Sequence, residues 1–403
     1  MNKAVENKKT RVVVIASPPT PYRLPFYNLI GGREDLDVTV LFCGEFEPTR
    51  EFQMSIGEGF RHEFLSGFPI TFHGRDQFFY FINPGILSRL AKTGHECLVV
   101  AGYFLFSSQA GILRSLFKGV PYLVWSESHL GKVRSAFRNR MKEVFLRPLL
   151  RRASGYLVTG TLSAQYMMHY GAKKEEIFRL CNTPDVNLFI ERGQALSERK
   201  QEIRRELGID PDAAVALFVG RLVEKKGLQH LLPAFRRVRE QVPKALMVIV
   251  GDGPYRTVLE PHIRELGDAV RMEGFRQVED LPKYYAAADL FACPSLDEPW
   301  GVVINEAMAS GLPVVASTAC GATPDLIRAG VNGIAVEPGD TEGIAAAVTK
   351  ILSLGDRGRE MGLASREIIR DWTPEQSAED FARAVKFATG QSRELSPWAQ
   401  RNL

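Results

Sequence analysis

The fold of this chain is decided by the stretch Val215-Ala-Leu-Phe-Val-Gly220-Arg221-Leu-Val-Glu-Lys-Lys226-Gly227. Its first five residues form a continuous apolar run, which is typical of a strand buried on both faces of a parallel sheet. A loop with a glycine at its start follows, and the amphipathic pattern of residues 228–241 then predicts a helix. A strand, a loop and a helix in this order form part of a βαβ unit.

The same alternation runs along most of the chain. The apolar runs predict strands at 11–17, 37–42, 97–101, 121–126, 155–159, 215–220, 246–251, 270–273, 290–294, 313–316 and 334–336. Helical patterns lie between several of them, at 108–117, 161–170, 228–241 and 281–288. The sequence therefore predicts an α/β protein with doubly wound parallel sheets.

The chain of 403 residues is long for one core and suggests two domains. The strand–helix alternation pauses at 182–197, where Asn182-Thr-Pro-Asp185 precedes a polar stretch. We expect one Rossmann-like domain over 1–190 and a second over 191–372, with a C-terminal helix within 373–403 that packs back on the first. Because ligands of such sheets bind at the carboxyl ends of the strands, the expected site lies in the cleft between facing domains.

Charge and cysteine content exclude several functions. A net charge of +4 is too small to imply nucleic acid, and the five cysteines contain no C-x-x-C pair, which favours free thiols in a reducing compartment. The apolar run near the N-terminus is too short for a signal-peptide core, and no stretch approaches the ~20 apolar residues of a membrane span. We therefore expect a cytoplasmic protein, or one resting on the cytoplasmic face of a membrane.

Two cations follow the strand at 215–220 within one loop. Arg221 offers a planar fork suited to phosphate, and Lys226 offers a compact point charge. A small residue at the strand end, Gly220, lets the backbone turn close to a ligand. Together these residues could bind a diphosphate and stabilise its charge as it departs, although a solvated basic loop would have the same composition.

A second element joins a strand to a helix that starts near Gly301, within Glu298-Pro-Trp-Gly-Val-Val-Ile-Asn-Glu306. The amides of a helix N-terminus favour an anion. The Glu298 carboxylate precedes that start, and Glu306 lies ~8 Å further along the helix. This separation suits one carboxylate on a sugar and another on a ribose. The alternative is a glutamate that only complements the helix dipole, together with a surface Glu306.

These two elements resemble those of glycosyltransferase family 4, a family of retaining enzymes with the GT-B fold of two Rossmann-like domains. Further matches are Val250-Gly-Asp-Gly-Pro254, Glu273-Gly-Phe275, Tyr284-Tyr-Ala-Ala-Ala-Asp289 and Gly330-Val-Asn-Gly333. The strong resemblance spans about residues 210–340, and the order and spacing of its motifs make it specific.

The resemblance implies a role for each matching residue. Arg221 and Lys226 match the pair that binds the donor diphosphate, Glu306 the glutamate that holds the ribose, and Glu298 the one that contacts hydroxyls of the transferred sugar. The other implied donor-binding residues are the helix start at Gly301 and Val302, the base-packing turn with Phe275 and Arg276, and the loop glycines Gly220, Gly251 and Gly253.

The resemblance also implies a mechanism and the absence of a cofactor. The family is generally metal-independent, and we expect the D-x-D motif Asp35-Leu-Asp37 to be structural. The co-substrate is expected to be a UDP- or GDP-sugar, because nothing in the sequence distinguishes the base. Retention is usually assigned to same-face substitution, in which the leaving diphosphate helps to deprotonate the acceptor. Arg221, Lys226 and Glu298 are then expected to act in catalysis.

The first domain departs from the family pattern at two loops. Where many relatives have a glycine-rich loop, this chain has Ser17-Pro-Pro-Thr-Pro-Tyr-Arg23, so Arg23 is either a phosphate ligand or the partner of a local carboxylate. Where relatives often place a histidine, it has Ser126-Glu127-Ser-His129. Glu127 is our first candidate for the group that positions or deprotonates the acceptor hydroxyl, and His129 is the second. Both could instead have a purely local role.

The segment Lys132–Arg152 holds eight basic residues and one acid, with apolar residues near helical spacing. Such a segment could rest on an anionic membrane, or it could pack its apolar face within the domain. Since the first domain binds the acceptor in this family, a lipid-linked saccharide or a growing glycan is the expected acceptor.

The sequence thus predicts a retaining glycosyltransferase of a glycan or lipid-linked acceptor, in cell-envelope or exopolysaccharide biosynthesis. The alternatives are a glycosyltransferase of a small-molecule acceptor, or a sugar phosphorylase or epimerase on the same fold. A dinucleotide oxidoreductase would need G-x-G-x-x-G after the first strand, which is absent. A binding module without activity is disfavoured because Arg221, Lys226, Glu298 and Glu306 occur together.

Overall fold

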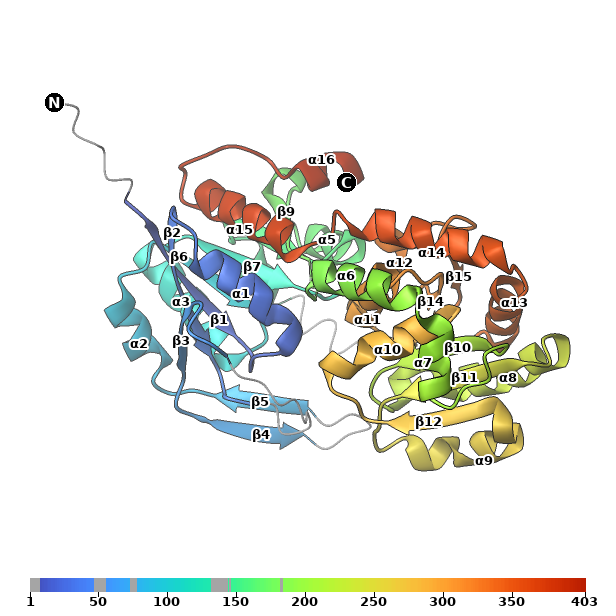
Figure 1. The fold of residues 1–403 in the computed structure, drawn as a ribbon. Coiled ribbons are helices and arrows are strands. Elements are labelled where there is room, and N and C mark those ends of the chain that lie inside the picture. Colours follow the sequence, from blue (N-terminus) through green and yellow to red (C-terminus); the bar gives the residue numbers. More distant parts are fainter. Residues whose placement is uncertain (1–7, 47–55, 73–77, 132–143, 145, 182–183) are drawn as a thin grey trace. The chain divides into compact units, whose positions relative to one another are not determined.

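The computed structural model describes residues 8–46, 56–72, 78–131, 144, 146–181 and 184–403, and the chain divides into two compact units. The first unit comprises Met1–Asn182 together with Pro374–Leu403, and the second comprises Thr183–Thr373. The helices and strands of each unit are drawn in Figure 1.

The first unit contains a parallel sheet of seven strands in the order β3-β2-β1-β6-β7-β8-β9. The innermost strands carry almost only buried apolar side chains, which explains why their sequences are continuous apolar runs. The strands are β1 (Thr10–Ala16), β2 (Leu36–Phe42), β3 (Arg61–Phe64), β6 (Cys97–Ala101), β7 (Tyr122–Ser126), β8 (Gly155–Val158) and β9 (Ile177–Arg179).

Helices cover both faces of this sheet. Side chains of α1 (Leu24–Gly31) and α15 (Pro374–Ala388) share one apolar cluster with Val12 and Val14 of β1. Val13 and Ile15 point into the opposite cluster, which contains side chains of α2 (Ile86–Thr93), α3 (Phe106–Lys118), α5 (Thr161–His169) and α16 (Pro397–Asn402), and of the helical residues 146–150. The C-terminal segment therefore supplies a helix to each face of the first sheet.

Smaller elements complete the first unit. An antiparallel pair, β4 (Phe68–Phe72) and β5 (Phe78–Ile82), forms a separate two-stranded sheet. One-turn helices occur at η1 (Pro21–Arg23) and η2 (Lys174–Glu176).

The second unit contains a parallel sheet of six strands in the order β12-β11-β10-β13-β14-β15. This is the order 3-2-1-4-5-6 of a Rossmann sheet, whose connections reverse direction between its first and fourth strands. The strands are β10 (Ala214–Val219), β11 (Ala245–Val250), β12 (Val270–Gly274), β13 (Leu290–Cys293), β14 (Val314–Ser317) and β15 (Gly333–Val336).

Two groups of helices surround the second sheet. The main apolar cluster is shared by α8 (Leu228–Gln241), α9 (Arg256–Leu266) and α13 (Thr341–Leu352), and Met361 of a further helix also belongs to it. The others pack on one another and are α6 (Val186–Ser197), α7 (Lys200–Glu206), α10 (Leu281–Ala287), α11 (Val302–Ala309) and α14 (Asp356–Ile369). The short elements are α12 (Thr323–Leu326), η3 (Glu224–Lys226), η4 (Gly267–Ala269) and η5 (Val278–Asp280).

The predicted α/β class with two doubly wound parallel sheets is confirmed, and every strand predicted from an apolar run is present within one or two residues at each end. The expected boundary at residue 190 falls inside α6, because Asp185 caps this helix through a hydrogen bond from Leu188 N and the helix packs against α10 and α11. The unit boundary lies instead at 182/183.

Candidate functional site

The predicted donor residues lie at the carboxyl ends of four adjacent strands of the second sheet. The loop after β10 carries Arg221 and Lys226, and the loop after β13 carries Glu298. β10 and β13 are hydrogen-bonded neighbours at the point where the sheet connections reverse direction, which is where open α/β sheets bind ligands. The two loops are themselves joined, since Leu296 N donates to Lys225 O at 2.7 Å.

Lys226 and Glu298 form an ion pair between these two loops. Their side chains are only 17% and 14% exposed. Burial disfavours the charged ammonium, but the Glu298 carboxylate together with the nearby Cys293 and Cys320 outweighs burial, so the pKa of Lys226 lies above its ordinary value. The ion pair thus keeps the Lys226 ammonium charged although its side chain is largely shielded from water.

Arg221, five residues before Lys226, is exposed. Within the described part of the chain, its guanidinium makes no hydrogen bond or ion pair with another side chain. An exposed planar fork in the same loop as a fixed ammonium is an arrangement that can take up a diphosphate.

The loop that carries Glu298 is held by its surroundings. Glu298 forms a bridge with Cys320, and Gly321 N donates to Glu298 O at 2.9 Å. Trp300 is 1% exposed, donates through its indole N–H to the Asn305 side chain at 3.0 Å, and stacks on Trp372 with centroids 5.2 Å apart. These contacts fix the backbone on both sides of the carboxylate.

Gly301 and Val302 begin α11 as the sequence predicts. Gly301 precedes the helix with φ +98°, a left-handed conformation that favours glycine, and Val302 is its first residue. The helix therefore starts directly after the Glu298 loop, with its first amides at the carboxyl end of β13.

Glu306 is buried in the second turn of α11, with 6% of its surface exposed. It is not a surface residue, which was the alternative left open by the sequence. The Tyr285 hydroxyl donates to Glu306 Oε2 at 2.7 Å. Burial raises the pKa of the Glu306 carboxyl to about 7, while the hydrogen bond from Tyr285 lowers it.

The remaining predicted residues flank this centre. Gly251 and Gly253 follow β11, and a Cβ on either would overlap the backbone carbonyls of Gly220 and Leu222 respectively. Both glycines therefore allow the loops after β10 and β11 to approach closely. After β12, Phe275 is 39% exposed, and Arg276 Nε donates to the Tyr284 hydroxyl at 2.8 Å.

The candidate acceptor residues lie in the first unit, where Arg23 and Glu127 are paired. Arg23 donates to the Glu127 carboxylate, and its guanidinium lies 4.7 Å from the centroid of the Trp125 ring. Burial opposes the charge of Arg23, but the Glu127 carboxylate together with Tyr22 and Tyr27 outweighs burial, so the pKa of Arg23 is raised. The structure thus shows the local carboxylate partner that the sequence left as one of two options. His129, two residues beyond Glu127, is 5% exposed.

Two further predictions concern membranes. Most of the basic segment Lys132–Arg152 lies outside the described residues, so its proposed membrane contact stays a prediction. Among the helices that the structure describes, none is both long and apolar enough to cross a bilayer.

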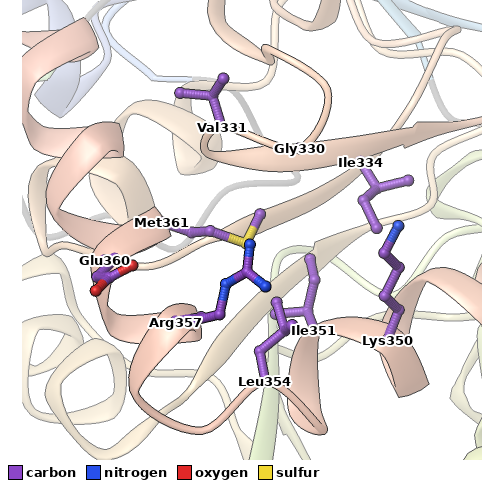
Figure 2. A pocket seen from close by; sticks show the side chains of 9 residues that line it. All are labelled: Gly330, Val331, Ile334, Lys350, Ile351, Leu354, Arg357, Glu360 and Met361. Carbon is purple, nitrogen blue, oxygen red and sulfur yellow. The ribbon is translucent and has the colours of Figure 1, made fainter.

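A separate pocket of about 460 Å³ lies at the far edge of the second sheet (Figure 2). Its walls come from β15, α13, α14 and adjoining turns. The side chains of Lys350 and Arg357 line it together with apolar residues such as Ile351 and Met361. Gly330 and Val331 of the matching motif Gly330-Val-Asn-Gly333 line this pocket, but none of the predicted site residues does, so it is distinct from the candidate donor site.

Sequence inspection missed the partners that hold the predicted residues. Tyr285 lies within the matching motif Tyr284-Tyr-Ala-Ala-Ala-Asp289, but the sequence alone indicated no role for its hydroxyl. Asp289 of the same motif accepts hydrogen bonds from Lys200, Arg204 and the amide of Val215, so its role is to join α7 to β10. Membership of this motif was the sequence signal that could have identified both residues as partners of the site.

Two parallel α/β units, each built as a Rossmann-like sheet covered by helices, define the GT-B class of folds. Residues 199–368 match the family model for Glycosyl transferases group 1. This match covers less than half of the chain and lies within the second unit, Thr183–Thr373.

The known proteins similar to this chain include two sequence relatives and one solved structure. An uncharacterized glycosyltransferase of Methanocaldococcus jannaschii is 34% identical over 53% of this chain and 58% of the relative, so the chain matches little more than half of that protein. Sulfoquinovosyl transferase SQD2 of Arabidopsis thaliana is 29% identical over 94% of this chain and 75% of the relative. The crystal structure of HepE from Anabaena with UDP superposes with a TM-score of 0.72 at 20% identity, covering 93% of this chain and 99% of HepE, which shows the shared GT-B fold.

Proposed function

We propose that this chain is a retaining, family 4 glycosyltransferase that moves a sugar from a UDP- or GDP-sugar to a hydroxyl of a glycan or lipid-linked acceptor. The observation that carries the proposal is the Lys226–Glu298 pair at the carboxyl ends of β10 and β13, next to the exposed Arg221. The UDP in the HepE structure supports a nucleoside diphosphate as the donor's leaving part.

In the proposed reaction the bond between the sugar's anomeric carbon and the diphosphate oxygen breaks, and a bond from the same face to the acceptor oxygen forms. The acceptor proton passes to the departing diphosphate. Arg221 and Lys226 stabilise the negative charge that develops on that leaving group, so no metal ion is needed there. Glu298 orients the sugar hydroxyls, and Glu306 accepts hydrogen bonds from the ribose.

The acceptor side of the proposal rests on the first unit. Glu127 is proposed to position the acceptor hydroxyl, and its ion pair with Arg23 holds the carboxylate in place. A role in cell-envelope or exopolysaccharide biosynthesis, on the cytoplasmic face of the membrane, belongs to the same proposal. Flotation of the full chain with anionic and neutral vesicles tests the membrane contact, which is refuted if neither vesicle carries the protein.

The test of the donor site is a thermal-shift screen of UDP-glucose, UDP-galactose, GDP-mannose and ADP-glucose with the full chain. A donor present at about 100 times its Kd should raise the melting temperature by about 5 °C. Arg221→Ala should lose most of that shift. The matched control is Arg236→Ala, which removes an exposed arginine of the same unit that pairs with Glu265. If no sugar nucleotide shifts melting, the proposal is wrong.

The stereochemical part needs a separate measurement. With the donor identified by the screen, the anomeric configuration of the first product is read by proton NMR before it equilibrates. Retention supports the family 4 assignment, and inversion overturns it while leaving the donor site intact.

A further inference from the structure

The Tyr285–Glu306 hydrogen bond joins two helices of the second unit. Tyr285 belongs to α10, which precedes β13, and Glu306 belongs to α11, which follows it. The tyrosine is 0% exposed and the glutamate 6%. The Tyr285 hydroxyl donates to one carboxylate oxygen of Glu306, Oε2, at 2.7 Å.

The tyrosine ring is held from two sides. Phe189 of α6 lies 6.1 Å away between ring centroids, at an interplanar angle of 79°, and Phe291 of β13 lies 5.9 Å away. A fully buried ring packed between two aromatic neighbours cannot turn aside, so the position of its hydroxyl is fixed by the core.

Building on the function proposed above, we propose that Tyr285 is a positioning residue for the donor: it anchors Oε2 of Glu306 and directs the other carboxylate oxygen to the ribose hydroxyls of a nucleoside diphosphate. The role goes beyond the implied contact of Glu306 with ribose, because it assigns the orientation of that carboxylate to a residue of another helix.

The hydrogen bond also controls the charge of Glu306. Burial raises the pKa of the carboxyl to about 7, and the tyrosine hydroxyl opposes that rise by stabilising the carboxylate. Only the ionised form presents both oxygens as acceptors. Tyr285 therefore keeps a larger fraction of Glu306 ready to accept from ribose at neutral pH.

The neighbouring elements offer few other groups that could titrate. α10 contributes Tyr285, and its other titratable residues are Lys283, which is exposed, and Tyr284, whose hydroxyl accepts from Arg276. β13 contributes Cys293, which raises the pKa of Tyr285. α14 contributes Arg366, which donates to Ser310 O at the end of α11. α6 approaches the end of α11 through Gly193, and the charged residues Glu191 and Arg192 of α6 are exposed. β14 contains no titratable residue. Within these described elements, the Tyr285 hydroxyl is the side-chain group that donates a hydrogen bond to Glu306.

The expected effect follows from the pKa. A hydrogen bond to a charged group is strong enough that its removal should raise the pKa of Glu306 from about 7 to about 8. The ionised fraction at pH 7 would then fall about five-fold, whereas at pH 9 the two proteins would differ by less than about 1.2-fold. The Kd of a ribose-containing ligand should change in the same proportion.

The experiment measures binding of UDP and GDP to the full chain by calorimetry at pH 6, 7, 8 and 9, for the wild type and Tyr285→Phe. The ratio of the two Kd values at each pH cancels the ionisation of the nucleotide itself. Tyr156→Phe is the matched control, because it removes another buried tyrosine hydroxyl, which donates to Leu150 O at 2.6 Å in the first unit. Inorganic pyrophosphate, which lacks ribose, is the control ligand.

The expected result is a Kd ratio about five times larger at pH 7 than at pH 9, where only the loss of positioning remains, with pyrophosphate binding and the Tyr156→Phe variant unaffected. A ratio that is the same at every pH, or an equal loss of pyrophosphate binding, would show a purely structural role and overturn the inference. If the wild type binds neither UDP nor GDP, the proposed function fails and the inference fails with it.

Discussion

Lys226 and Glu298 form a buried ion pair although 72 residues separate them in the sequence. Removing one partner of such a pair leaves an uncompensated charge, so Lys226→Ala and Glu298→Ala should each lower the free energy of unfolding by about 2 kcal/mol. The double variant should lose less than the sum of the two. Urea unfolding of the four proteins of this cycle measures the coupling, and additive losses would contradict a direct interaction.

Stability should also depend on pH through Glu306. Its pKa of about 7 lies above the ordinary value of 4.5, so the folded state holds the proton more tightly than the unfolded state does. The resulting stabilisation is complete below about pH 4.5 and is lost as the pH rises through 7. Glu306→Gln cannot ionise and escapes this loss. Its free energy of unfolding should therefore gain roughly 2–3 kcal/mol on the wild type between pH 5 and pH 8.

Urea unfolding of the two proteins at both pH values checks this prediction. Other titrating groups contribute equally to both proteins, so they cancel in the difference. A difference that does not change with pH would mean that the Glu306 carboxyl has an ordinary pKa.

The Arg23–Glu127 pair predicts a similar cost in the first unit. The side chains are 14% and 25% exposed, and the guanidinium also lies against the Trp125 ring. Arg23→Ala should lower the free energy of unfolding by about 2 kcal/mol. Arg11→Ala is the control, because its ion pair with Glu96 is exposed and should contribute less than about 1 kcal/mol. Equal losses in urea unfolding would refute the special role of the buried pair.

Gly251 predicts a steric effect on the donor loops. A Cβ at this position would overlap the Gly220 carbonyl oxygen, so Gly251→Ala must displace the loop that carries Arg221. Gly267→Ala is the control, because Gly267 also has a positive φ, of +53°, but a Cβ there meets nothing within 4 Å. We expect a loss above about 2 kcal/mol for Gly251→Ala against about 1 kcal/mol for the control. Melting temperatures that fall equally would contradict this.

The sequence predicted the sheets well for a physical reason. A strand buried on both faces, such as Val215–Val219 in β10, needs apolar residues at every position and therefore leaves a continuous run. β3 (Arg61–Phe64) at the sheet edge is short and polar, and β4 (Phe68–Phe72) is exposed at every position, so neither has this signature. The sequence predicts a pause in the alternation at 182–197 where α6 lies, because the break at Asn182-Thr-Pro-Asp185 does not distinguish a loop from a helix that Asp185 caps.

The candidate site residues that belong to local motifs could be proposed from the sequence. The pairings between residues that depend on tertiary contacts could not. Glu298 and Glu306 lie eight residues apart, and a helix start between them has a recognisable composition. Tyr285 meets Glu306 only because α10 and α11 flank the same strand, and Arg23 meets Glu127 from 104 residues away. No local pattern encodes such pairings, since they depend on how the strands and helices register in three dimensions.

The return of Pro374–Leu403 to the first unit has a consequence for biosynthesis. α15 and α16 supply core residues such as Phe381 and Trp398 to opposite faces of a sheet whose strands all lie before residue 180. On the ribosome, the second unit is complete in sequence while the first still lacks these helices. The unit that is translated first is therefore the last to be able to close its core.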